Sequence, residues 1–235
     1  MSEKLLAFDI WGDYGYFRRG YTTTSTITYP FPSRTSIAGL ISSILGIERD
    51  GYYDIFSENN SKIGLRILNP INKINLNFNY INTKASFSLA DIKKNPRVQV
   101  QAEFLKDVKY RIYVSLNDKQ LMEQLFDLLN NHKSIFTPCL GISECLADFK
   151  LVYDEFINVK PIYGENIDIN SVILKENKID IEPGKDYGII KSPGFMDNER
   201  RVLKFLEYYY EKNGKTIKIK NGDYYKIGEE NIVLY

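Results

Sequence analysis

The sequence predicts an α+β fold: a ferredoxin-like (RRM-like) domain with a long β-hairpin inserted between its second and third strands, and a small β-rich region after it. Three observations support this prediction. Strand and helix patterns follow one another in the order strand, helix, strand, strand, helix, strand. Two segments with period-two alternation interrupt that order at about residues 71–108. Short strands with Gly and Pro turns come last, so we expect one domain over residues 1–158 and a β-rich subdomain over 159–235.

The first half of the domain is predicted to contain two strands and one helix. Residues 5–11 form a short apolar run that is typical of a strand. A helix follows over about residues 33–45, where apolar residues recur at helical spacing. Ser33 can cap its N-terminus just after a proline, and Gly46 can end it. Residues 63–68, IGLRIL, are predicted to form the second strand.

The second half repeats the pattern with one more helix. Residues 110–116, YRIYVSL, alternate well and predict the third strand. Asn117 or Asp118 can then cap a second helix, whose apolar stripe ends before Asn130. A fourth strand is expected between residues 145 and 156. This order of elements is the ferredoxin-like arrangement shared by RNA-recognition folds.

The insertion over residues 71–108 is predicted to project as an extended hairpin, here called the thumb. The segments INLNFNYI and VQVQAEFL both alternate with period two, and a loop near residues 91–96 separates them. Residues 71–106 carry six basic and two acidic residues, a local charge of +4. Such a ribbon can lie along a nucleic-acid backbone. Alternatively, its lysines only keep an exposed hairpin soluble and prevent edge pairing.

Composition restricts the classes of function. The net charge is +1, so nucleic-acid binding must come from local basic patches. We expect a cytoplasmic protein, because no stretch has the character of a signal peptide or a membrane span. Two cysteines are too few for a disulfide framework or a zinc cluster. We therefore expect no metal and no cofactor.

The case for catalysis is weak. The chain has one histidine, His132, and no Walker, HExxH, CxxC or GxGxxG motif. A histidine at a helix C-terminus more often interacts with the helix dipole than it catalyses. A metal-free ribonuclease needs only a positioned base and acid, which His132, Lys133 and a tyrosine could supply.

The connector between the first strand and the first helix is the better candidate for function. It is long, and no acidic residue occurs from Tyr14 to Ile47. Arg18 and Arg19 can make bidentate phosphate contacts, and Arg34 lies in the first helical turn, where free N–H groups favour anions. Five rings can stack on bases or fill the core beneath the connector: Tyr16, Phe17, Tyr21, Tyr29 and Phe31. Four hydroxyls can donate to phosphate or ribose: Thr22, Thr23, Thr24 and Ser25.

Three segments also resemble a known family. They are residues 8–47, FDIWGDYGYFRRGYTTTSTITYPFPSRTSIAGLISSILGI, residues 97–114, RVQVQAEFLKDVKYRIYV, and residues 137–149, TPCLGISECLADF. In this order they resemble the Cas five family of CRISPR-associated proteins, which belongs to the RAMP superfamily. The subtype that they resemble most is type I-B. The C-terminal part of the chain carries little of the resemblance.

The resemblance implies a non-catalytic, CRISPR RNA-binding subunit of a Cascade antiviral surveillance complex. Such a subunit holds the 5′ handle of the guide, with the hairpin as its thumb. Its expected partners are the CRISPR RNA, the Cas seven backbone subunit and the Cas eight large subunit, with target DNA near the PAM reached through the complex and no membrane. The residues implied in RNA binding are Arg18, Arg19, Tyr21, Thr22, Thr23, Thr24, Ser25, Arg34, Arg97 and Gln99.

Two alternatives stay open at this point. The type I-C branch of the family cleaves repeat RNA with Tyr, Lys and His side chains. This chain has no histidine in its N-terminal half, and in I-B systems a separate Cas six enzyme cuts the RNA, so the resemblance predicts no nuclease activity. The other alternative is an RNA-recognition protein that acts outside CRISPR.

Overall fold

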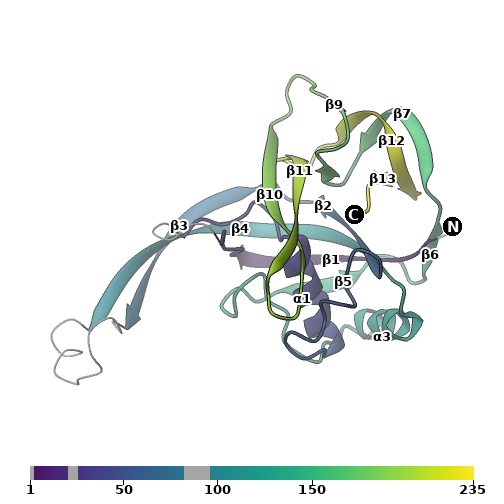
Figure 1. Cartoon of the computed structure of the whole chain (residues 1–235). Coiled ribbons are helices and arrows are strands. Elements are labelled where there is room, and N and C mark those ends of the chain that lie inside the picture. Colours follow the sequence, from purple (N-terminus) through teal and green to yellow (C-terminus); the bar gives the residue numbers. More distant parts are fainter. Residues whose placement is uncertain (1–2, 21–25, 82–95) are drawn as a thin grey trace.

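The computed structural model describes residues 3–20, 26–81 and 96–235 (Figure 1). In these residues the fold is mixed α/β and consists mostly of strands. The two helices are α1 (Arg34–Leu45) and α3 (Lys119–Asn130). The strands are β1 (Glu3–Gly15), β2 (Ser61–Ile67), β3 (Asn72–Ile81), β4 (Arg97–Leu116), β5 (Asp148–Leu151), β6 (Ile157–Val159), β7 (Ile162–Ile169), β8 (Ile173–Leu174), β9 (Ile179–Asp180), β10 (Tyr187–Met196), β11 (Val202–Glu211), β12 (Ile217–Ile227) and β13 (Glu230–Ile232).

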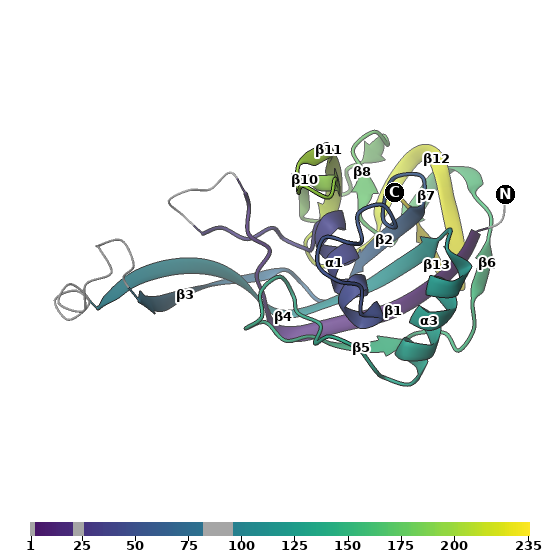
Figure 2. The same ribbon diagram turned by 60° about the horizontal axis from the view of Figure 1, so that its bottom comes forward.

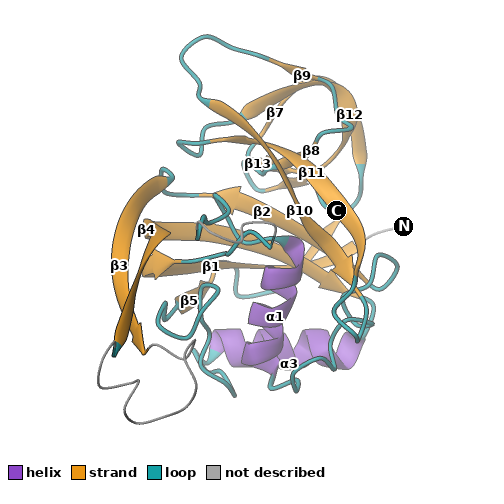
Figure 3. Cartoon of the chain, turned by 60° about the vertical axis from the view of Figure 1, so that its left-hand side comes forward, coloured by secondary structure: helices purple, strands orange, loops and turns teal. Residues whose placement is uncertain are grey.

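The central sheet has the strand order β2-β4-β1-β5, and all neighbouring strands are antiparallel. Two further strands extend it, because β3 pairs with β4 and β6 pairs with the start of β1. The helices α1 and α3 lie on one side of this sheet, and β12 and β13 pack against the other side (Figure 3). Strand β10 contacts α1. The predicted strands and helices of this part of the chain all occur, with bounds that differ by a few residues except for the third strand, which begins at Arg97 and not at residue 110.

Helix α1 begins and ends as its sequence predicts. The N–H of Ser36 donates to Oγ of Ser33 at 3.2 Å, and Gly46 has the left-handed φ of 76° that a C-terminal glycine supplies. Apolar side chains such as Ile37 and Ile41 point into the main core. The small residues between the apolar ones let this helix pack closely on its neighbours.

Helix α3 is capped by Asp118, whose Oδ1 accepts from the N–H groups of Gln120 at 2.9 Å and Leu121 at 3.1 Å. Its buried stripe contains Leu125 and Leu129. The outer face of the helix is charged and polar. The apolar residues of the buried stripe recur at helical spacing, and this spacing is the pattern that predicts the helix.

The predicted thumb is present as an antiparallel pair of β3 with the first half of β4, from Asn72 opposite Lys106 to Ile81 opposite Arg97. The sequence did not indicate that β4 is one strand of 20 residues, shared by the thumb and the central sheet. Asp107 lies between the two halves with a φ of 53°. This kink does not end the strand, because β1 pairs with β4 on both sides of it.

The region after residue 158 is rich in strands, as predicted, and forms two small sheets. One has the order β10-β11-β8, and the other has the order β13-β12-β7 with β9 beside β12. The segment VLKFLEYYY, which mixes both periods, is strand β11. Side chains from this region, among them Phe195 and Tyr208, belong to the main core cluster. The region is therefore packed into the rest of the protein, and the division at residues 158–159 stays a prediction.

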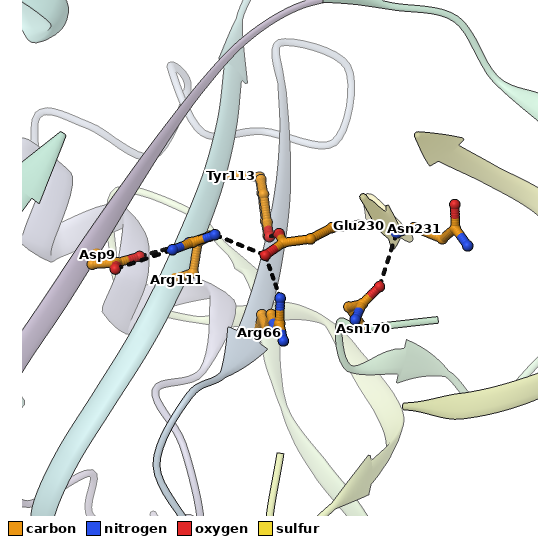
Figure 4. Close-up of polar contacts among 7 residues, drawn as sticks. All are labelled: Asp9, Arg66, Arg111, Tyr113, Asn170, Glu230 and Asn231. Carbon is orange, nitrogen blue, oxygen red and sulfur yellow. Dashed lines mark hydrogen bonds and ion pairs between the residues drawn. The ribbon is translucent and has the colours of Figure 1, made fainter. Parts of the chain in front are cut away.

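A network of charged groups joins β13 to the central sheet (Figure 4). Arg111 donates to Asp9 at 2.7 and 3.2 Å and to Glu230 at 2.7 Å. Glu230 also accepts from Arg66 and from the hydroxyl of Tyr113. Burial acts to lower the pKa of Arg111, but its bonds to Asp9 and the nearby carboxylates outweigh burial and raise that pKa.

For Tyr113, burial raises the pKa of the phenol, and the hydrogen bond to Glu230 raises it further. The phenol therefore stays protonated and donates to the carboxylate at neutral pH. Beside this network, the backbone N–H of Asn231 donates to Oδ1 of Asn170 at 2.9 Å. Among the described residues, no helix is both long enough and apolar enough to cross a bilayer.

Candidate nucleic-acid interface

The connector is shorter than predicted, because β1 continues to Gly15, and its two described flanks run side by side. The N–H of Arg19 donates to the carbonyl of Ile27 at 3.0 Å, and the N–H of Tyr29 donates to the carbonyl of Phe17 at 2.8 Å. Arg18 forms an antiparallel bridge with Thr28. The connector is thus a narrow two-stranded ribbon and not an open loop in its described part. Residues 21–25, which include five predicted RNA-binding residues, lie outside the described part.

Arg18 and Arg19 lie on this ribbon near the surface. Arg18 is exposed and Arg19 is half-buried. Nε of Arg19 donates to the carbonyl of Thr28 at 3.2 Å, and its guanidinium lies 5.5 Å from the ring centroid of Tyr29. The ring and the carbonyl fix the orientation of the guanidinium.

The connector aromatics within the described residues are part of the core. Tyr16, Phe17, Tyr29 and Phe31 are all buried in the main cluster. Burial of large rings is the more common role for such residues. The sequence left two roles open for these rings, stacking on bases or filling the core. The structure shows that these four rings fill the core beneath the connector.

Arg34 corrects an expectation. Its side chain is only 1% exposed and is enclosed by protein groups. It donates to the carbonyl of Phe56 at 2.6 Å, to the hydroxyl of Ser61 at 2.7 Å and to the carbonyl of Ser61 at 3.1 Å. Its guanidinium also lies 4.2 Å from the ring centroid of Phe195. Burial lowers the pKa of Arg34 to about 10. A phosphate cannot reach this group in the folded protein, so the prediction of an RNA contact at Arg34 is wrong.

A signal for this burial was present in the sequence. Arg34 precedes Ile37 by three residues and Ile41 by seven, and residues at these spacings share one face of a helix. That face is the apolar face of α1. A basic residue on an apolar helical face is expected to point inward or to extend along the core, whatever its position in the first turn.

The thumb has two faces of different chemistry, which follow from its period of two. On one face, Asn77 lies opposite Gln101 and Asn79 lies opposite Gln99. Arg97, near the described end of β4, is exposed, as is Gln99. The side-chain amides of this face can both donate and accept hydrogen bonds. The asparagines were not among the predicted site residues, although the alternation INLNFNYI places them all on one side.

The connector and the thumb lie side by side, which the sequence did not show (Figure 2). The N–H of Glu103 donates to the carbonyl of Thr26 at 2.9 Å, and the hydroxyl of Thr26 donates to the carbonyl of Gln101. Thr26 also forms a parallel bridge with Ala102. The returning flank of the connector therefore continues the sheet where β1 has ended, on the edge of β4.

Glu103 brings a carboxylate to this otherwise basic and polar junction. Its Oε1 accepts from Nζ of Lys73 at 2.9 Å and from the N–H of Thr28 at 3.3 Å. The carboxylate is thus bonded to the thumb and the connector at once. These bonds hold the two elements together and offset the negative charge that a polyanion would meet.

His132 lies elsewhere, beside edge strand β5. Its Nε2 is 3.2 Å from Oδ1 of Asp148, and its ring stacks on Phe149 with centroids 5.1 Å apart. Burial raises the pKa of the thiols of Cys139 and Cys145, so both are protonated at neutral pH. Within the described residues, no group of three His, Cys, Asp or Glu side chains is placed to hold a metal ion.

Comparison with known proteins shows which family the part of the chain that carries this interface matches. The model of the family described as CRISPR-associated protein (Cas_Cas5) matches residues 5–193. This range contains the connector, the thumb and both helices. A search of curated proteins found no match to this sequence.

Solved structures share the fold at low sequence identity. A chain of a CRISPR RNA-guided surveillance complex has a TM-score of 0.57 and 12% identity, with 91% of each chain covered. A CRISPR protein from Archaeoglobus fulgidus has a TM-score of 0.56 and 15% identity, with 99% of this chain and 98% of that chain covered. A chain of a Type III-B Cmr-beta complex bound to cognate target RNA has a TM-score of 0.50 and 14% identity, with 91% of this chain and 86% of that chain covered.

Proposed function

Because the chain belongs to the Cas five family of CRISPR-associated proteins, whose model matches residues 5–193, we propose that it binds the 5′ handle of a CRISPR RNA in a Cascade-type complex. The structural neighbours are consistent with this proposal, since one of them is a chain of a CRISPR RNA-guided surveillance complex. In such complexes the protein holds the backbone and shape of the guide, while base pairing reads the sequence.

The observation that carries the proposal is the junction of connector and thumb at Thr26. It brings the ribbon with Arg18 and Arg19 beside the strand that carries Gln99 and Arg97. Guanidinium groups make charge-assisted bonds to phosphates, and amides can bond bases or riboses. RNA lying across both elements would meet cations from one and amides from the other. Arg34 is not part of this surface.

The finer assignments belong to the same proposal. The strand order β2-β4-β1-β5 with two helices on one face supports a ferredoxin-like domain. The resemblance of residues 8–47 supports type I-B, with the Cas seven backbone subunit and the Cas eight large subunit as partners. Target DNA near the PAM would then be reached through the assembled complex.

We propose further that the chain is not a nuclease. The geometry that supports this is the place of His132, which contacts Asp148 and Phe149 at edge strand β5. The thumb and the connector lie along the other strands of the sheet, on β4 beyond the end of β1. Incubation of the purified protein with repeat RNA in EDTA tests this directly. Cleavage at one position of the repeat that is lost in His132→Ala would support the metal-independent ribonuclease instead.

The binding function is tested by the RNA that co-purifies with the protein from its native cells. Short RNAs with one common 5′ end, accompanied by other CRISPR-associated subunits in mass spectrometry, are the expected result. A mixture of messenger fragments without such subunits would show an RNA-binding protein outside CRISPR. Arg18→Ala/Arg19→Ala should release the short RNAs, whereas Lys226→Ala, an exposed lysine on β12, should retain them.

A further inference from the structure

The face of the thumb opposite its amides carries a continuous row of aromatic rings. Tyr16 stacks on Phe104 with centroids 4.7 Å apart and ring planes 20° from parallel. Phe104 contacts Phe78 at 5.3 Å and 30°. Phe78 stacks on Tyr80 at 5.9 Å and 20°. The row thus runs from the base of the connector through β4 and outward along β3.

The row begins in the core and ends in solvent. Phe104 is 3% exposed, whereas Tyr80 is 54% exposed. Among the described residues, the ring contacts of this row end at Tyr80. An exposed tyrosine ring presents a flat apolar face that can be buried against a flat partner.

We propose that Tyr80 is a stacking platform for one nucleobase of the bound RNA. This inference rests on the proposed function and assigns a role to a residue outside the predicted binding set. Stacking suits Tyr80 because the inner rings hold its plane nearly parallel to that of Phe78. A base placed on its outer side would extend an existing stack, and the thumb would lose little conformational freedom on binding.

The electrostatic surroundings favour a base carried by an anionic chain. Residues 74–81 and 97–102 contain no acidic residue, and Arg97 is their single charged side chain. A phosphate backbone crossing this part of the thumb therefore meets no repulsion from these segments. Arg97 pairs with Ile81 and so projects from the amide face, opposite the face of Tyr80 but at the same end of the thumb. A nucleotide stacked on Tyr80 belongs to a chain that can place a phosphate near Arg97 across the edge of the thumb, whereas an aliphatic side chain of a protein partner carries no such anion. The structure therefore favours a nucleotide.

A variant pair separates stacking from general damage to the thumb. Tyr80→Ala removes the ring, and Tyr80→Phe retains it. Ile81→Ala is the matched control, because Ile81 is the next residue, is 70% exposed and points to the other face of the strand. Circular dichroism and thermal unfolding should show that all three variants fold.

The probe is the guide RNA that co-purifies with the protein, synthesised intact and with a single abasic nucleotide at each position in turn. Tyr80→Ala should weaken binding of the intact RNA about 10-fold, while Tyr80→Phe and Ile81→Ala bind as the wild type does. One abasic RNA should bind the wild type about 10-fold more weakly and show no further loss with Tyr80→Ala. That pairing would identify the stacked base.

Three results would overturn the inference and leave the proposed function intact. In the first, wild type and Tyr80→Ala bind the intact guide equally well. In the second, Tyr80→Ala loses the same affinity for every abasic RNA, which would make the ring structural. In the third, Tyr80→Ala loses only assembly with protein subunits, which would make the ring a protein contact. Failure of the wild type to bind any guide would instead contradict the proposed function itself.

Discussion

Arg34 donates two hydrogen bonds to Ser61, to its hydroxyl at 2.7 Å and to its carbonyl at 3.1 Å, inside the junction of α1 with β2. These bonds and the one to Phe56 satisfy buried acceptors that no other described donor is shown to reach. Nε of Arg34 also donates to the backbone oxygen of Tyr235 at 3.3 Å. The arginine therefore holds α1, β2 and the segment at Tyr235 together.

Replacement of Arg34 should accordingly lower stability and not RNA affinity. Arg34→Met keeps much of the apolar stem but leaves the carbonyls of Phe56 and Ser61 unsatisfied, which should reduce the free energy of unfolding by about 2–4 kcal/mol. Urea denaturation measures this loss. Arg97→Met, at an exposed position, should change stability by less than about 0.5 kcal/mol. A stable Arg34→Met protein with impaired RNA binding would restore the discarded role of Arg34.

Arg18, Arg19 and Arg97 should govern the salt dependence of RNA binding. Each phosphate contact that is removed should reduce the slope of log affinity against log salt by about 0.7 for single-stranded RNA. Arg18→Ala/Arg97→Ala should therefore bind more weakly and with a flatter slope in fluorescence anisotropy titrations at several salt concentrations. Lys226→Ala also removes a positive charge, but from β12, and should leave the slope unchanged. Equal slopes for all variants would place the phosphates elsewhere.

Glu211 should make stability depend on pH in the acid range. Burial acts to raise the pKa of Glu211, but hydrogen bonds from the N–H groups of Asp186, Lys215 and Asn213 outweigh burial and lower it. Because the folded pKa is lower than the unfolded one, the carboxylate stabilises the fold above the ordinary glutamate range, and this is lost as the pH falls through the folded value.

The variant Glu211→Gln replaces one acceptor oxygen by a donor that faces N–H groups. It should unfold with a free energy about 1–2 kcal/mol smaller at pH 7. The difference from wild type should shrink as the pH is lowered, which urea denaturation at pH 7, 5 and 3 can follow. A difference that stays constant with pH would show that the carboxylate is not the titrating group.

Glu230 should be the most sensitive member of the network that joins β13 to the central sheet. Glu230→Ala leaves Arg66 and the phenol of Tyr113 without their shared acceptor, and Arg111 retains only Asp9. Removal of one partner from a partly buried ion pair of this kind should cost about 3 kcal/mol. Thermal unfolding and hydrogen exchange of residues 225–232 measure the effect. Glu229→Ala, one residue earlier and exposed, is the control.

Local patterns predicted much of this fold. Ser33, Gly46 and Asp118 mark helix ends through bonds that involve only a few neighbouring residues, so the sequence contains the whole signal. The thumb was predicted from the period-two alternation of two segments. The length of β4 could not be predicted in this way, because the kink at Asp107 interrupts the alternation while pairing with β1 continues through it.

The candidate site was less accessible to sequence reasoning. The proximity of Thr26 to Gln101 is a contact over 75 residues, and no local pattern encodes it. The position of Arg34 in the first turn of α1 favours an anion, but its place on the apolar face of the helix buries it. The sequence shows a tyrosine at position 80 but not the row of rings that packs behind it.

Strand β4 runs for 20 residues from Arg97 to Leu116 and belongs to both the thumb and the central sheet. Strand β2 leaves the sheet opposite Tyr110, and at about 3.3 Å per residue the thirteen residues from there to Arg97 reach about 43 Å beyond that point. The inner end of the thumb is held in the central sheet, because β4 pairs there with both β1 and β2. A partner that binds the outer end is therefore connected to the central sheet through one continuous strand. Displacement of the outer end must either bend this strand at Asp107 or rotate the whole subunit.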